Sequence, residues 1–65
     1  MEQFIRDNFR IVEWKNMDGS ILEGFEYQDK NGFTCVTKLD FFIDNLEQFV
    51  DIIEHWEEQG YNVPE

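Results

Sequence analysis

Residues 44–60, DNLEQFVDIIEHWEEQG, carry the strongest helical pattern of the chain, and the interpretation of the other segments depends on them. With about 100° of turn per residue, the large apolar side chains fall on one side, which predicts a buried face. These side chains are Leu46, Phe49, Ile53 and Trp56, flanked by Val50 and Ile52. We therefore expect one amphipathic helix over about residues 45–59, packed on the rest of the protein.

Both ends of this helix carry recognisable signals. Asp44 and Glu47 fit a capping box, in which each side chain accepts a hydrogen bond from the backbone N–H of the other residue. Gly60 predicts the left-handed residue of a Schellman motif, with Tyr61 packing back onto Trp56. The pattern therefore predicts a sharp start and a sharp end for the helix.

A row of acidic side chains lies on the same helix, opposite the apolar face. Glu47, Asp51, Glu54 and Glu58 follow one another at intervals of four, three and four residues, a predicted length of roughly 16 Å. Like charges four residues apart destabilise a helix, and so do acids in its last turn, where Glu57 lies as well. We expect these five carboxylates to serve a partner rather than the stability of the fold.

The net charge of −10 is unevenly distributed along the chain. Residues 1–38 hold seven acidic and five basic side chains, whereas residues 39–65 hold eight acidic side chains and no basic one. Direct binding to nucleic acid or to an anionic membrane is disfavoured, because both need a basic patch. A basic protein partner is favoured, and the alternative is that the acids serve solubility alone.

Three strand patterns precede the helix. They cover residues 9–16, 20–28 and 33–39, are rich in β-branched and aromatic residues, and are separated by Asp-Gly and Asn-Gly turn signals. We expect a single α+β domain over residues 1–65, a three-stranded antiparallel meander followed by one C-terminal helix packed on the sheet. Residues 1–8 are expected to form either a short helical turn or an added edge strand.

The register of the second hairpin depends on its loop length. If the loop has three residues, with Gly32 left-handed, Cys35 shares a face with Phe25 and that face packs on the helix. A two-residue loop would place Val36 there instead. The three-residue loop is preferred. Gly24, inside the second strand, predicts a bulge or a close approach by a neighbouring ring.

Few side chains are available for catalysis or metal binding. The chain has one histidine, His55, one cysteine, Cys35, and no Gly-rich phosphate loop, calcium-loop spacing or zinc spacing. We interpret His55 as a boundary residue and Cys35 as a small apolar one. The expectation is a protein that is not an enzyme and has no cofactor or metal site. A lone cysteine, with no signal peptide or transmembrane pattern, favours the cytoplasm.

In size and charge the chain resembles the small acidic inhibitors made by phages and mobile elements: DNA-mimic anti-restriction proteins, anti-CRISPR proteins and inhibitors of uracil-DNA glycosylase. It is also similar to the immunity proteins that neutralise nuclease toxins. The resemblance implies a non-catalytic inhibitor that occludes the basic nucleic-acid-binding surface of a DNA- or RNA-handling protein. The phosphate surrogates are then Glu47, Asp51, Glu54, Glu57 and Glu58.

The alternative is a structural or adaptor module. Eleven of the 65 side chains are aromatic, seven of them Phe, which is a large number for so small a core. An exposed aromatic surface would mediate a homodimer or a heterocomplex, with the acids serving only solubility.

Overall fold

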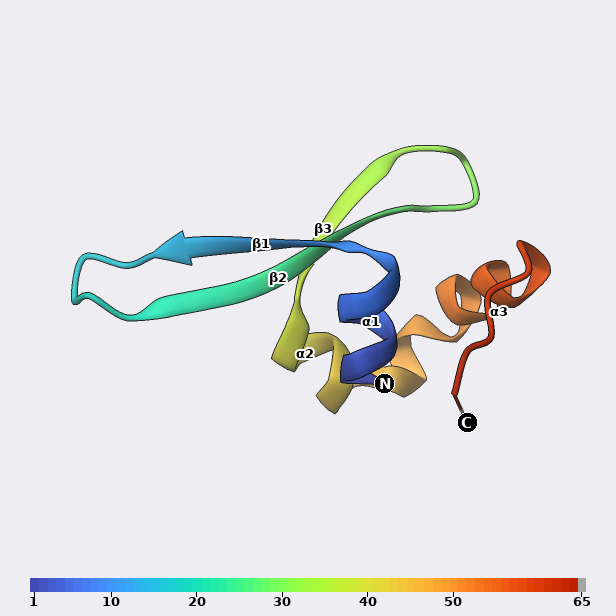
Figure 1. Ribbon diagram of the computed structural model, residues 1–65. Coiled ribbons are helices and arrows are strands. Elements are labelled where there is room, and N and C mark those ends of the chain that lie inside the picture. The colour runs from blue at the N-terminus through green and yellow to red at the C-terminus, as the bar shows by residue number, and fades with distance from the viewer. Residues whose placement is uncertain (65) are drawn as a thin grey trace.

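Three antiparallel strands form one sheet in the order β1-β2-β3, with helices before and after it, so the predicted α+β meander is confirmed (Figure 1). The computed structural model describes residues 1–64. The strands are β1 (Arg10–Lys15), β2 (Ile21–Gln28) and β3 (Thr34–Lys38). The helices are α1 (Glu2–Asn8), α2 (Leu39–Asp44), the 3₁₀ segment η1 (Leu46–Phe49) and α3 (Val50–Glu58).

Left-handed glycines close both hairpin turns. In the second turn the backbone N–H of Asp29 donates to the carbonyl of Phe33 at 3.0 Å, so the loop between them has three residues, and Gly32 has φ 84°. The Asp29 side chain accepts from the Phe33 N–H at 2.9 Å and holds the loop closed. Gly19 has φ 90° in the first turn. The preferred three-residue loop is therefore confirmed.

One face of the sheet carries the core. Tyr27 pairs with Cys35 across the second hairpin, as the three-residue loop predicts. The side chains of Phe25 and Tyr27 lie under the helices on this face. The buried core residues come from α1, β2, α2 and α3 and are Ile5, Phe25, Tyr27, Leu39, Phe42 and Trp56. None of the described helices is long and apolar enough to cross a membrane.

The opposite face of the sheet is not covered by any described element. Trp14 on this face is 41% exposed, and its indole ring lies over Gly24. A ring therefore approaches this glycine closely, which is one of the two outcomes that its position in the strand predicts. The β1–β2 hairpin extends away from the core as an arm, which gives the molecule extents of 40 × 24 × 21 Å (Figure 1).

The single helix predicted over residues 45–59 is divided. Residues 39–44 already form α2. The helical conformation is interrupted at Asn45 (φ −129°, ψ 41°), and η1 and α3 follow. Asp44 is the last residue of α2, so the predicted capping box with Glu47 is wrong. The Asn45 side chain instead donates to the carbonyl of Phe41 at 2.9 Å and caps the end of α2. The helical region from Leu46 to Glu58 still packs on the sheet, as predicted.

The C-terminal end of α3 is the predicted Schellman motif. Gly60 has φ 97°, the Tyr61 N–H donates to the Trp56 carbonyl, and the Gly60 N–H donates to the Glu57 carbonyl, both at 3.0 Å. The Tyr61 ring lies 5.4 Å from that of Phe9, between centroids. The Tyr61 ring therefore packs on Phe9 and Phe4 at the start of the described chain, and not on Trp56 as predicted.

The apolar face of the helical region differs from the prediction at one position. Trp56 is 2% exposed, but Val50 is 48% exposed. The break before α3 changes the direction of the helix, so Val50 no longer shares the face of the residues before it. The remaining apolar positions are partly buried against the core and are Leu46, Phe49, Ile52 and Ile53.

Residues 1–8 form a helix rather than an edge strand, and an arginine ties this helix to the sheet. Arg6 donates to Glu2 within α1 at 3.0 Å and makes two hydrogen bonds of 3.1 Å to Glu23 on β2. Hydrogen bonding to Arg6, with its positive charge, lowers the pKa of Glu23 below its ordinary value of 4.5. Hydrogen bonds from Ser20 lower the pKa of Asp18 in the first turn.

Replacing Gly24 by Ala is expected to destabilise the protein. Gly24 has no positive φ, so an alanine here would ordinarily stabilise by about 0.4–1 kcal/mol. Its Cβ, however, would lie 2.7 Å from the Thr37 carbonyl oxygen and 2.7 Å from the Trp14 ring. We expect a loss of about 1–3 kcal/mol in urea denaturation. The loss should persist in a Trp14→Ala background, because the Thr37 contact remains. A Gly24→Ala protein as stable as the parent would contradict the close approach.

Acid is expected to destabilise the fold through Glu23 and Asp18. Both carboxylates have a lowered pKa in the folded state, so their contribution is present above the unfolded pKa and is lost as the pH falls through the folded one. Thermal melting temperatures should therefore fall between about pH 5 and pH 3. Glu23→Gln should make this fall shallower. Glu47→Gln, which changes an exposed carboxylate outside the Arg6 pairs, should leave it unchanged. Equal slopes for the two variants would refute the assignment.

Candidate functional site

The acidic residues predicted as a partner-binding site all lie at the surface. Asp51, Glu54, Glu57 and Glu58 are exposed on α3, and Glu47 is exposed on η1. Within α3, Asp51, Glu54 and Glu58 follow at intervals of three and four residues, so they share one side of the helix. We call the four carboxylates of α3 the acidic face.

Glu47 does not continue this row along one helix. It belongs to η1, and Phe49 between the two segments has φ −114° and ψ 21°, which are not helical values. The continuous 16 Å row predicted from Glu47 to Glu58 is therefore wrong. The acidic face spans seven residue steps, or roughly 10 Å. Along the helix axis its four carboxylates lie at a mean interval of about 3.5 Å, comparable with the ~3.4 Å of axis per phosphate on one DNA strand. Glu57 lies to the side of the row formed by the other three.

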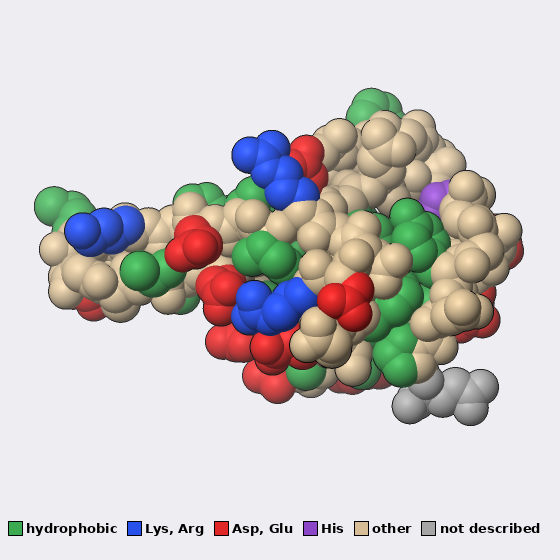
Figure 2. Space-filling model, in the orientation of Figure 1, with side chains coloured by type: hydrophobic (Ala, Val, Ile, Leu, Met, Phe, Trp, Pro, Cys, Tyr) green, Lys and Arg blue, Asp and Glu red, His purple; other side chains and the backbone are tan. Residues whose placement is uncertain are grey.

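The ion pairs found in residues 1–64 all lie away from the acidic face. Two of the five basic side chains, Arg6 and Arg10, pair with acids elsewhere: Arg6 with acids of α1 and β2, and Arg10 with Glu26 at 3.6 Å. Across residues 1–64, no carboxylate of the acidic face forms an ion pair. Figure 2 shows Lys and Arg on the hairpin arm and in the centre, beside Asp and Glu, and further Asp and Glu at the edge where α3 lies. The charges of α3 therefore face solvent or a partner.

Backbone electrostatics divide the acidic face into two halves. Asp51 lies in the first turn of α3, where the positive end of the helix dipole stabilises a carboxylate. Glu57 and Glu58 lie in the last turn, where the dipole opposes them, and Glu58 follows Glu54 at four residues. The C-terminal half therefore carries charge at the expense of helix stability.

The other candidate groups are separate from this face. His55 is half-buried, and Cys35, also half-buried on β3, directs its thiol toward the carbonyl of Phe33 at 3.8 Å. Within the described part of the chain, the side chains of His55 and Cys35 form no hydrogen bond with each other. No three His, Cys, Asp or Glu side chains of residues 1–64 converge to hold a metal ion.

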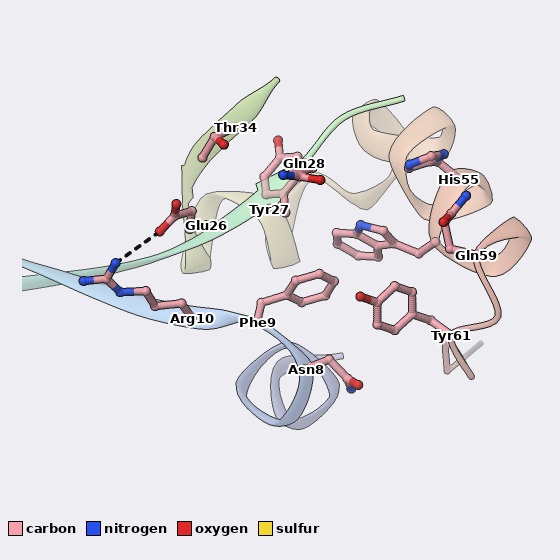
Figure 3. A pocket seen from close by; sticks show the side chains of 11 residues that line it. Asn8, Phe9, Arg10, Glu26, Tyr27, Gln28, Thr34, His55, Gln59 and Tyr61 are labelled. Atoms are coloured by element: carbon pink, nitrogen blue, oxygen red, sulfur yellow. Dashed lines mark ion pairs between the residues drawn. The ribbon is translucent and has the colours of Figure 1, made fainter. Parts of the chain in front are cut away.

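Sequence reasoning missed a cleft of about 550 Å³ at the end of the sheet. It lies between the junction of α1 and β1, the end of β2 and one side of α3 (Figure 3). Its walls include the rings of Phe9 and Tyr61, with Gln28 and Gln59 at the opening. Asn8 of α1 lines the cleft, and the sequence left residues 1–8 open between a helical turn and an edge strand, so no sequence signal defined it.

The uncovered face of the sheet is a second surface that the sequence did not define. Its apolar side chains come from all three strands: Val12 and Leu22 are half-buried, and Trp14 and Val36 are exposed. The alternation of side chains along the strands places them together once the register is known. We call these four residues the open face.

Comparison with protein-family models, with curated proteins and with solved structures gave no match.

Proposed function

We propose that the protein is a small, non-catalytic inhibitor that occludes the basic nucleic-acid-binding surface of a DNA- or RNA-handling protein. The observation that carries this proposal is the acidic face: four exposed carboxylates on a nine-residue helix, with no basic side chain after Lys38 to pair with them. Their mean interval along the helix axis is similar to the axial interval of phosphates on one strand of DNA. The phage or mobile-element origin and the cytoplasmic setting implied by size, charge and the lone cysteine belong to the same proposal.

The helix gives the carboxylates a fixed arrangement. Trp56 is buried on the inner side of α3, and a Schellman motif closes its end, so α3 is held in place by packing and by backbone hydrogen bonds. Carboxylates on a helix that is already fixed in place lose little backbone entropy when they bind the Arg and Lys side chains of a partner. Opposite charge on the partner would then raise the association rate and select the partner.

The C-terminal half of the acidic face gives the sharpest test. Glu54→Gln with Glu58→Gln removes a like-charge pair and a charge opposed to the helix dipole, so stability should rise by a few tenths of a kcal/mol. Affinity for the partner should fall by about 1–3 kcal/mol. Stability is measured by urea denaturation, and binding by the salt needed to elute proteins retained from a bacterial lysate on the immobilised protein.

The matched control removes the same charge elsewhere. Glu13→Gln with Asp40→Asn changes two exposed carboxylates on β1 and α2 that form no ion pair within residues 1–64. This double variant should lose far less binding than the variant with Glu54→Gln and Glu58→Gln. Duplex DNA or RNA should displace the proteins that the immobilised parent protein retains. Equal losses in the two double variants would mean that net charge, and not the acidic face, drives retention. That outcome would reject the proposal.

A second function is favoured by the open face. Four apolar side chains, with Trp14 41% and Val36 49% exposed, leave this side of the sheet without a cover. Such a patch is typical of an interaction surface. An adaptor module would use it for a homodimer or a heterocomplex.

Salt distinguishes the two functions. A complex formed through the open face should persist at about 1 M salt, where the Debye length falls to ~3 Å, and Val36→Lys should disrupt it. A complex formed through the acidic face should dissociate at that salt concentration and tolerate Val36→Lys. Sedimentation velocity at low and high salt measures both the homodimer and the heterocomplex. A protein that stays monomeric and retains nothing at either salt concentration would exclude both functions.

A further inference from the structure

We infer that the cleft at the end of the sheet binds an extended peptide segment of a partner protein. The segment would accept a hydrogen bond from the Trp56 indole and pair with the free edge of β2. This inference does not rest on the acidic face, because the cleft is formed by different side chains.

The first observation is a buried donor without a partner. Trp56 lines the cleft and is 2% exposed, and its Nε1 has no hydrogen-bond partner in the described part of the chain. A buried N–H that gives up water without gaining an acceptor is costly. The Tyr27 hydroxyl pairs with the Thr37 hydroxyl at 3.0 Å, and it is not within hydrogen-bonding geometry of the indole. Because Nε1 itself is shielded from solvent, an incoming carbonyl oxygen would satisfy the indole once the side chains beside it in the cleft shift.

The second observation is a strand edge that ends unpaired at the cleft. The Asn16 N–H donates to the Ser20 carbonyl, so these two residues form a hydrogen-bonded pair. In an antiparallel ladder every second pair is hydrogen-bonded, and the last such pair between β1 and β2 is therefore Arg10↔Glu26. The next backbone groups of β2 that face this side belong to Gln28. Asn8, which would lie opposite Gln28 if β1 began earlier, belongs to α1, so β1 does not extend far enough to pair with Gln28. The N–H and C=O of Gln28 are therefore available to an added strand.

The third observation is the chemistry of the lining. Asn8, Gln28 and Gln59 offer neutral amides, and the two charged lining groups, Arg10 and Glu26, are 3.6 Å apart and neutralise each other. An uncharged ligand with donors and acceptors matches these groups better than an anion or a cation.

The walls add an apolar requirement. The Phe9 ring packs at a tilt against Trp56 at 4.7 Å and against Tyr61 at 5.4 Å, between ring centroids, so aromatic rings form one side of the cleft (Figure 3). A peptide group carries one donor and one acceptor, and an adjoining Leu or Phe side chain would pack on the rings. Addition of a strand to a free sheet edge, with a pocket for a side chain, is a common mode of peptide recognition.

Nuclear magnetic resonance with a minimal peptide unit tests the inference. The probe is N-acetyl-L-leucine N-methylamide, and a Trp14→Phe protein assigns the indole N–H of Trp56. The indole resonance of Trp56 and the backbone N–H of Gln28 should shift saturably, with a dissociation constant of about 1 mM. The indole of Trp14, on the open face, should not move. If neither group shifts at about tenfold that concentration, the inference is overturned.

Two matched comparisons test the strand edge. Gln28→Pro removes the backbone N–H that faces the cleft, whereas Gln28→Ala keeps it; the proline variant should bind the probe roughly 2- to 10-fold more weakly and the alanine variant as the parent does. N-acetyl-L-leucine N,N-dimethylamide lacks the N–H that would donate to the Gln28 carbonyl and should also bind more weakly. This second comparison leaves the protein unchanged, so it decides the matter even if Gln28→Pro does not fold. Equal binding of the two probes would refute strand addition.

Discussion

The packing of one indole ring holds the elements of this small protein together. Trp56 lies on α3, and its ring contacts Phe4 of α1, Phe25 and Tyr27 of β2 and Phe42 of α2, with centroid distances of 5.5–6.2 Å. A chain of 65 residues buries little surface, so a few large rings must supply most of the apolar burial. Because these rings come from elements distant in the sequence, the helices and the sheet assemble around a single contact point.

The break in the C-terminal helical region follows from the same constraint. A continuous helix over residues 39–58 would be about 30 Å long and would hold Leu39 and Trp56 far apart. Leu39 and Phe42 must reach the same core as Trp56, so the chain has to turn between them. The turn occurs at Asn45, a residue that disfavours the helix interior and can bond a preceding carbonyl.

Local signals in the sequence predict most of the sheet. The Asp-Gly and Asn-Gly turns determine the loop lengths and thereby the strand register, and Gly60 determines where α3 ends. Each of these features depends on the conformation of one glycine, which the sequence shows directly. The short helices α1 and α2, of seven and six residues, have too few turns for a clear period and gain their stability from packing. The identity of the acidic residues could be read from the sequence. Their arrangement could not, because the break before α3 separates Glu47 from the others.

The acidic face and the cleft share a helix, and this has a thermodynamic consequence. A nine-residue helix is marginal by itself, and its like charges weaken it further, so α3 is helical mainly because Trp56 is docked. A ligand that bonds the Trp56 indole and the edge of β2 at the same time needs the docked state and would therefore stabilise it. The same docked state is the one in which the carboxylates hold their arrangement. By linkage, occupation of the cleft and binding at the acidic face would each strengthen the other, to the extent that α3 undocks in the free protein.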